Sequence, residues 1–203
     1  MIRLICSLTS PYARKIRVVL AEKALPFELV EDIPWNDSTR VPDFNPLGKV
    51  PALVADDGSI WFDSPVIAEY LDVMHPSPQM MPADRQAALP VRQSEALADG
   101  IIDAAVLAFL ERSRPQELRS QANIDRQYGK IARGVNALAG RLEAADGLNR
   151  GQLSIADVAA GCALGYLDLR FPDIDWRSGR AGLAEYGEAL LSRPSFRASA
   201  PPG

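Results

Sequence analysis

The feature that most constrains the fold is a change of pattern near residues 78–83. Before this stretch, short apolar runs of strand length alternate with two helical patterns, whereas after it apolar residues recur only at helical spacing. An alternating segment followed by a run of helices is typical of two separate domains. The sequence therefore predicts an α+β domain over residues 1–77, a linker over 78–83 and an all-helical domain over 84–203.

The first domain has a βαβ pattern followed by a ββα pattern. Ile2–Ser7 and Phe27–Val30 have the composition of strands, and a helical pattern that begins at Pro11 lies between them. A strand, a crossover helix and a second strand form a right-handed unit with parallel strands. Asp56-Asp57-Gly58 then separates two further apolar runs and predicts a hairpin. With a second helix from Pro65, this order predicts a thioredoxin-like domain.

The second part of the chain contains four helical patterns, over residues 85 or 90 to 112, 116–145, 155–169 and 183–191. Pro90 either starts the first of these helices or kinks it. Ser154 and Asp157 have the spacing of a capping box, a serine cap with an acid at the third helical position. This pair is therefore predicted to begin a helix rather than to form a catalytic Ser-Asp pair.

Two serine-proline pairs, Ser10-Pro11 and Ser64-Pro65, stand where helical patterns begin. Serine is a favoured N-cap, and proline suits the first helical position because its missing N–H would be unpaired there. A helix N-terminus attracts negative charge through its unpaired N–H groups and its dipole. One helix end would suit a thiolate and the other a carboxylate, as a site for a small thiol peptide requires, but plain helix capping explains the same pairs.

Composition excludes several other classes of protein. The net charge is −4 with acidic and basic residues interspersed, so neither nucleic acid nor a membrane surface is an expected partner. No run approaches the roughly 18 apolar residues of a membrane span, and a cytoplasmic protein is expected. Cys6 and Cys162 lie far apart and are expected to be small buried side chains rather than a disulfide. His75 has no second histidine to complete a metal site, and it stands beside Pro76 at the end of a helical pattern, where a catalytic triad is not expected.

Four blocks of the sequence, in order, resemble the cytosolic glutathione transferase family over nearly the whole chain. These blocks are Thr9–Tyr12, Asn45–Pro51, Phe62–Leu71 and Ser154–Asp157. The first two are most similar to the bacterial, YibF-like branch of that family. The resemblance implies a thioredoxin-like N-terminal domain that binds glutathione as a substrate, an all-α C-terminal domain, and no metal.

The resemblance also implies roles for individual residues. Val50 is expected to pair its backbone with the cysteinyl part of glutathione, next to a cis peptide bond at Pro51. Ser64 is expected to take the α-carboxylate of the γ-glutamyl group through its hydroxyl and N–H, while Asp63 faces the ammonium group. Lys49 either reaches a carboxylate of the tripeptide or is simply solvated.

Ser10 matches the position of the thiol-activating residue in the serine- and cysteine-type classes, and Thr9 is the alternative hydroxyl. A free thiol has a pKa near 8.5, so ionisation at neutral pH requires a shift of roughly two units, or about 2.7 kcal/mol. A hydroxyl bonded to a charged acceptor contributes about 1.5 to 3 kcal/mol and a helix N-terminus about 0.3 to 1 kcal/mol. These two contributions suffice without a charged base. Because serine stands where redox enzymes carry cysteine, redox catalysis through a protein thiol is disfavoured.

Three functions follow from the resemblance: an enzyme that transfers glutathione to small hydrophobic electrophiles or reduces peroxides in detoxification, a glutathione-binding protein with little activity, and a non-catalytic interaction module. The presence of Val50-Pro51 and Asp63-Ser64 argues against the module, which has no need of a peptide site. The acceptor is expected near Tyr12 and residues Asp99 to Leu107, although these also suit ordinary core or interface positions. A homodimer is expected from the resemblance.

Overall fold

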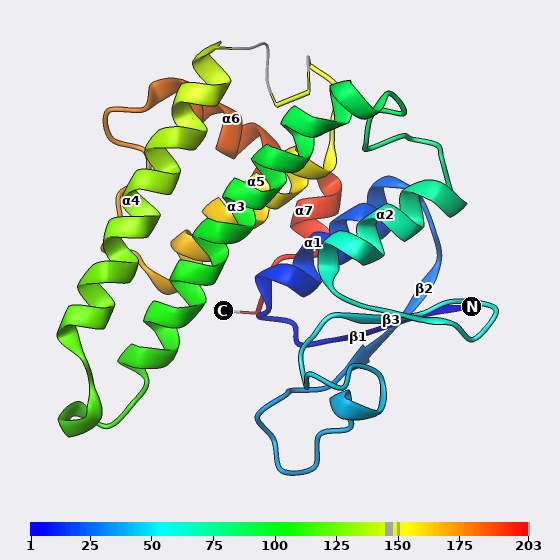
Figure 1. The fold of residues 1–203 in the computed structure, drawn as a ribbon, viewed down its shortest axis with the longest axis horizontal. Helices are drawn as coiled ribbons and strands as arrows, with labels where there is room; N and C mark the ends of the chain where they lie inside the picture. Colours follow the sequence, from blue (N-terminus) through cyan, green and yellow to red (C-terminus); the bar gives the residue numbers. More distant parts are fainter. Residues whose placement is uncertain (145–147, 150, 203) are drawn as a thin grey trace. The chain divides into compact units, whose positions relative to one another are not determined.

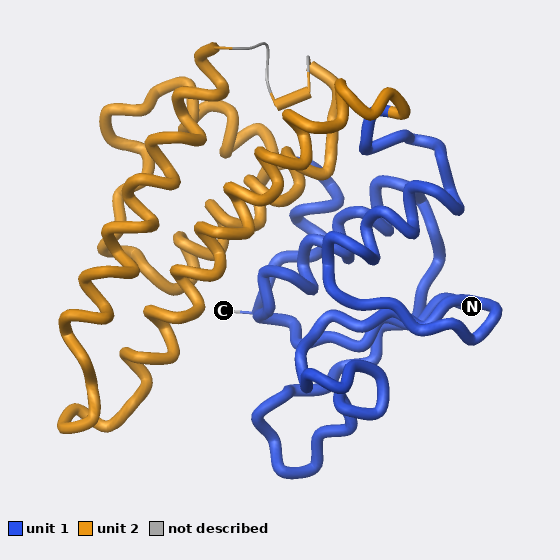
Figure 2. Tube along the Cα trace, viewed as in Figure 1, with its two compact units in different colours: residues 1–82, 193–203 blue, residues 83–192 orange. Residues whose placement is uncertain are grey.

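The structure is a computed structural model that describes residues 1–144, 148–149 and 151–202. The chain forms two compact units, shown in separate colours in Figure 2. Unit 1 contains Met1–Pro82 together with the chain from Arg193 onward, and unit 2 contains Ala83–Ser192. Unit 1 is an α+β unit of thioredoxin-like layout, and unit 2 is built from helices.

Unit 1 contains a four-stranded sheet whose strand order is β2-β1-β3-β4. Its elements are β1 (Ile2–Cys6), α1 (Pro11–Glu22), β2 (Phe27–Glu31), the 3-10 helix η1 (Val41–Asp43), β3 (Ala52–Val54), β4 (Ile60–Trp61), α2 (Ser64–Met74) and α7 (Pro194–Ala198). Strands β1 and β2 are parallel, and β3 runs antiparallel to both β1 and β4. The predicted βαβ and ββα order is confirmed.

Helices α1 and α2 lie side by side over the sheet (Figure 1). A separate apolar cluster joins the strands to the segment before β3: Ile5 and Ala52 pack with Val41, and Phe44 and Val50 lie against them. The segment between β2 and β3 is therefore held against the sheet by buried side chains.

The β3–β4 hairpin turns at the predicted Asp-Gly pair. Gly58 has a φ of +84°, in the left-handed region that glycine adopts without a steric cost. The Ala55 N–H donates to the carbonyl of Ser59 at 2.8 Å, which closes the turn. Local sequence is sufficient to specify this hairpin.

Helix α2 begins one residue earlier than its Ser-Pro pair predicts. Asp63 is the N-cap and accepts a hydrogen bond from the Ser64 N–H, so Ser64 is the first helical residue. Aspartate and serine are about equally good N-caps, and Pro65 still lies in the first turn, where no intrahelical donor is needed. The expectation that Ser64 itself caps α2 is wrong.

The chain after α6 joins unit 1, whereas the sequence assigned all of 84–203 to the helical domain. We call residues 193–202 the strap. Arg193 donates to both carboxylate oxygens of Glu22 on α1, at 2.8 and 2.9 Å. Phe196 is fully buried. The predicted boundary differs because the strap has only one short helix, α7, whose partners lie far away in the sequence.

A buried ion pair holds the chain that leaves α2. Lys23 donates through Nζ to Asp72 at 2.8 Å and to the carbonyls of His75 and Pro78, both at 2.7 Å. Asp72 also accepts from the backbone N–H of Met80 at 2.8 Å. The Lys23 side chain has no solvent exposure and that of Asp72 has 11 %. The pair thus connects the end of α1 to the segment that follows α2.

Unit 2 contains five helical elements in the described part of the chain: α3 (Arg85–Arg112), the 3-10 helix η2 (Gln116–Leu118), α4 (Gln121–Ala144), α5 (Ile155–Arg170) and α6 (Ala181–Ser192). Pro90 lies inside α3, whose N-cap is Asp84. The helix therefore starts at Arg85 and not at Pro90. The predicted end of the next helix at Ala145 lies outside the described residues.

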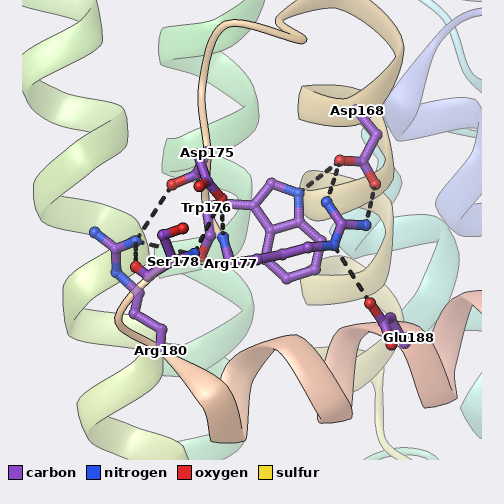
Figure 3. Close-up of polar contacts among 7 residues, drawn as sticks. All are labelled: Asp168, Asp175, Trp176, Arg177, Ser178, Arg180 and Glu188. Carbon is purple, nitrogen blue, oxygen red and sulfur yellow. Dashed lines mark hydrogen bonds and ion pairs between the residues drawn. The ribbon is translucent and has the colours of Figure 1, made fainter.

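The segment between α5 and α6 is held by the network in Figure 3. Asp168 on α5 accepts two hydrogen bonds from the Arg177 guanidinium, at 2.7 and 2.9 Å, and one from the indole N–H of Trp176 at 2.7 Å. The guanidinium carbon of Arg177 lies 3.8 Å from the centroid of a Trp176 ring. Trp176 is buried against Gly187 of α6, where a Cβ atom would come within 2.7 Å of the indole.

Helix α5 begins with the capping box that its sequence predicts. The Ser154 N–H and hydroxyl both donate to the Asp157 carboxylate, and the Ser154 side chain also accepts from the backbone at the third helical position. Tyr186 on α6 donates to the other Asp157 oxygen. Burial, followed by the neighbouring Asp157 charge, raises the pKa of Tyr186, so the phenol stays protonated as the donor. Asp157 thus connects the start of α5 to α6, a contact that the box pattern does not predict.

We expect Asp72→Ala to lower the free energy of unfolding by about 3 kcal/mol or more, because it leaves the Lys23 ammonium buried without its carboxylate. Urea denaturation followed by circular dichroism measures the change. The control is Asp43→Ala, which removes the exposed Arg40–Asp43 pair and should cost less than about 1 kcal/mol. Equal effects of the two substitutions would contradict the buried ion pair.

Asp157→Ala should cost about 3 kcal/mol, because it removes the box, worth about 1 kcal/mol, and a charged hydrogen bond worth about 1.5 to 3 kcal/mol. Tyr186→Phe removes only the second contribution and should cost roughly half as much. Both changes are measured by chemical denaturation. A near-wild-type stability of Asp157→Ala would argue against both contacts.

Candidate functional site

The strand pairing brings three separate segments to one edge of the sheet. Ile5 near the end of β1 is paired with Ala52 at the start of β3, and Leu53 is paired with Trp61 at the end of β4. The turn after β1, the bend before β3 and the start of α2 after β4 therefore meet at this edge. We call it the site edge.

The first segment of the site edge is the turn from Ser7 to Ser10. The Ser10 N–H donates to the Ser7 carbonyl at 3.1 Å, and the Ser10 Oγ accepts from the Ala13 N–H at 3.2 Å as the N-cap of α1. This cap uses an oxygen lone pair and leaves the hydroxyl proton for donation. No acidic residue lies in the first turn of α1 to oppose the helix dipole.

The alternative hydroxyl, that of Thr9, lies close to a second hydroxyl. Thr9 Oγ1 lies 3.3 Å from Ser7 Oγ, at hydrogen-bonding distance with either atom as donor. Within the described part of the chain, the Ser10 hydroxyl proton has no acceptor. Because either oxygen can be the donor in the Thr9–Ser7 contact, the choice of Ser10 over Thr9 as the donor to a ligand stays a prediction.

The second segment is the bend before β3, where the Val50–Pro51 peptide bond is cis. Buried Asn45 holds this bend: its side-chain amide donates to the Lys49 carbonyl at 2.8 Å, and its Oδ1 accepts from the Leu47 N–H at 3.0 Å. No hydrogen bond within the described residues engages the backbone N–H or carbonyl of Val50. One donor and one acceptor are thus available for an extended peptide.

The third segment is the start of α2. The Ser64 side chain is fully buried, and its Oγ has no hydrogen-bond partner among the described residues. Buried polar atoms nearly always have a partner, so an unpaired hydroxyl at a helix N-terminus indicates a missing ligand group. The Ser64 N–H, expected to share this ligand group, instead donates to the carboxylate of exposed Asp63.

The remaining predicted site residues lie as follows. Lys49 is exposed beside the bend. Tyr12 lies half-buried in the first turn of α1 in unit 1, whereas residues 99–107 belong to α3 in unit 2. Their role in binding an acceptor stays a prediction. Ser154 and Asp157 form the cap of α5 described above.

Both cysteines are buried. Burial raises the pKa of the Cys6 thiol to about 11, so this thiol is protonated at neutral pH and is a poor nucleophile. The described residues contain no group of His, Cys, Asp or Glu able to hold a metal ion. Among the same residues, no helix is long and apolar enough to cross a membrane.

Sequence reasoning assigned no role to Ser7 or Asn45, although both shape the site edge. Asn45 bonds its own backbone two residues later, in an Asx turn. An asparagine followed by proline, leucine and glycine is a signal for such a turn. Ser7 carries no comparable signal because its role depends on the position of Thr9 and Ser10.

Comparison with known proteins shows the family of this chain. Residues 9–74 match the family model of the glutathione S-transferase N-terminal domain, and residues 121–189 match that of the C-terminal domain. The chain therefore belongs to the glutathione S-transferase family. It is 43 % identical to the uncharacterized GST-like protein YibF of Escherichia coli K12, with 98 % of each chain covered.

Several solved structures of similar proteins contain glutathione or a derivative of it. The glutathione S-transferase of Methylobacillus flagellatus, with glutathione bound, is 42 % identical with a TM-score of 0.95, and 100 % of both chains is covered. That of Methylobacterium radiotolerans, in complex with glutathione sulfonate, is 43 % identical with a TM-score of 0.94, covering 100 % of this chain and 95 % of the other.

Proposed function

We propose that this protein binds glutathione at the site edge and activates its thiol for attack on small electrophiles or peroxides. The observation that carries the proposal is that one edge presents three polar groups without a partner among the described residues: the Ser10 hydroxyl proton, the Val50 backbone and the Ser64 Oγ. These groups match the thiol, the cysteinyl backbone and the α-carboxylate of one tripeptide. Glutathione in similar solved structures supports the proposal.

Ser10 activates the thiol by stabilising its anion rather than by removing the proton. The hydroxyl donates to the thiolate while its oxygen still accepts from Ala13, and the dipole of α1 adds to the stabilisation. The thiol proton goes to solvent. The thiolate sulfur then forms a bond to the electrophilic carbon, and the leaving group departs with the electron pair of the broken bond.

The two other candidate functions use the same fold differently. A glutathione-binding protein with little activity would retain Val50 and Ser64 but gain nothing from the Ser10 donor. An interaction module would have no use for a buried Ser64 hydroxyl that none of the described residues pairs with. The available proton of Ser10 therefore favours the enzyme.

The proposal includes a homodimer in the cytoplasm, with a small hydrophobic or electrophilic co-substrate. The homodimer is supported by membership of the glutathione S-transferase family. We also propose that Lys49, which is exposed beside the bend before β3, binds a carboxylate of glutathione.

Ser64→Ala should weaken glutathione binding about 10- to 100-fold, since a hydrogen bond to a carboxylate contributes about 1.5 to 3 kcal/mol. Isothermal titration calorimetry measures the change, with exposed Ser38→Ala as the control. Cysteinylglycine, which lacks the γ-glutamyl group, should bind the wild type and Ser64→Ala alike. Wild-type protein that does not bind glutathione would refute the proposed function.

Ser10→Ala should raise the pKa of bound glutathione by about 1 to 2 units and, through the smaller thiolate fraction, lower conjugation at pH 7 about 3- to 25-fold. The physical reason is loss of the hydroxyl donor to the thiolate. Thiolate absorbance in the ultraviolet gives the pKa, and a chromogenic electrophile gives the rate. Thr9→Val is the control and should change neither quantity; the reverse pattern would assign activation to Thr9. Unchanged activity of Ser10→Ala would leave Ser10 with a capping role only.

A further inference from the structure

We propose that the strap is a positioning device for thiol activation: residues 193–202 hold α1 in place and thereby aim the Ser10 hydroxyl. This inference rests on the proposed function and extends it to Arg14, Arg17 and Phe196. None of these residues needs to contact glutathione. They act through the position of α1.

The strap follows α1 along its length. Near the end of α1, Glu22 accepts from Arg193 and from the Ser195 hydroxyl. The Arg193 hydrogen bond, the larger influence, and that of Ser195 lower the pKa of Glu22, so its carboxylate stays charged at neutral pH. The strap is thus joined to the end of α1 farthest from Ser10.

Near the start of α1, two arginines bind the backbone of the strap. Arg14 donates through Nη2 to the Phe196 carbonyl at 3.1 Å, and its guanidinium carbon lies 5.6 Å from the Phe196 ring centroid. Arg17 donates to the carbonyls of Ser199 and Ala198 at 3.2 and 3.4 Å. The last carbonyls of a helix lack intrahelical donors, so these arginines satisfy the C-terminal end of α7.

Arg14 connects the strap directly to the cap of α1. Its backbone N–H donates to the Ser10 carbonyl at 2.9 Å and closes the first helical turn, while its side chain reaches the strap. Arg14 is only 7 % exposed and Phe196 is fully buried, so neither can move without rearranging its neighbours. A shift of the strap would therefore displace the first turn of α1.

Small displacements matter at Ser10 because a hydrogen bond to the thiolate depends steeply on geometry. A misplacement of about 1 Å of a catalytic group can cost about 10²-fold in rate. Binding of the γ-glutamyl group depends on Ser64 at the start of α2. The hydrogen bonds of the strap given above go to α1 and not to Ser64. Loosening the strap should thus impair activation more than binding.

The test uses Phe196→Leu and Arg17→Met in the full chain. The first keeps an apolar side chain at the buried position, and the second keeps the aliphatic stem but removes both donors. Each should raise the pKa of bound glutathione by about 0.5 to 1 unit and lower kcat at pH 7 about 1.5- to 3-fold, with activity recovering at higher pH. The dissociation constant of glutathione should change less than about twofold.

Hydrogen exchange provides a readout that does not depend on the ligand. The Ala13 and Arg14 amides, both bonded to Ser10, should exchange faster in the two variants than in the wild type. The matched control is Asp168→Asn, which weakens the Arg177 network of unit 2. It should lower the melting temperature while leaving the thiol pKa and these two amides unchanged.

The outcomes separate the two proposals. Variants that are less stable but retain the wild-type thiol pKa, kcat and amide exchange would overturn the role of the strap while leaving the proposed function intact. Wild-type protein without glutathione binding would overturn the proposed function and the thiol-positioning role together. Faster exchange of the two amides and a raised thiol pKa in both Phe196→Leu and Arg17→Met would support the positioning role of the strap. The control Asp168→Asn should show neither effect.

Discussion

The antiparallel pairing of β1 with β3 is the constraint on which the candidate site depends. The register that pairs Ile5 with Ala52 puts the end of β1 beside the start of β3, and the following hairpin returns the chain to the same edge through β4. Ser10, Val50 and Ser64 are more than ten residues apart in sequence, yet each lies just outside a strand at this edge. A slip of one residue in this register would move the side chains of a strand to the opposite face of the sheet, and Ser10, Val50 and Ser64 would no longer lie together.

Helix α1 is held at both ends by polar contacts. At its start, Ser10 caps the helix and Arg14 reaches the Phe196 carbonyl; at its end, Glu22 binds Arg193 and Lys23 binds Asp72. The buried charges among these groups are tolerated because each has close partners of opposite charge or carbonyl oxygens. The apolar face of α1 packs in the core, while these polar contacts specify where the helix lies along its axis.

Features that depend on neighbouring residues were predictable. The Asp-Gly turn at Gly58, the cap at Ser10 and the capping box at Ser154 all appear as their local patterns indicate. The start of α2 was less clear from sequence, because Asp63 and Ser64 are both good caps and the local pattern does not choose between them. Pro90 was also ambiguous, since proline is compatible with a helix start as well as with a bend.

The sequence by itself determined the alternation of strands and helices, the change to an all-helical unit and the identity of the polar side chains near each helix start. Tertiary structure alone decided that the strap joins unit 1, that Tyr186 shares Asp157 with Ser154, and that the Ser64 hydroxyl has no partner among the residues that the structure describes. The physical reason is range: hydrogen-bonded turns and caps close within a few residues, whereas burial and partner choice depend on side chains that only folding brings together.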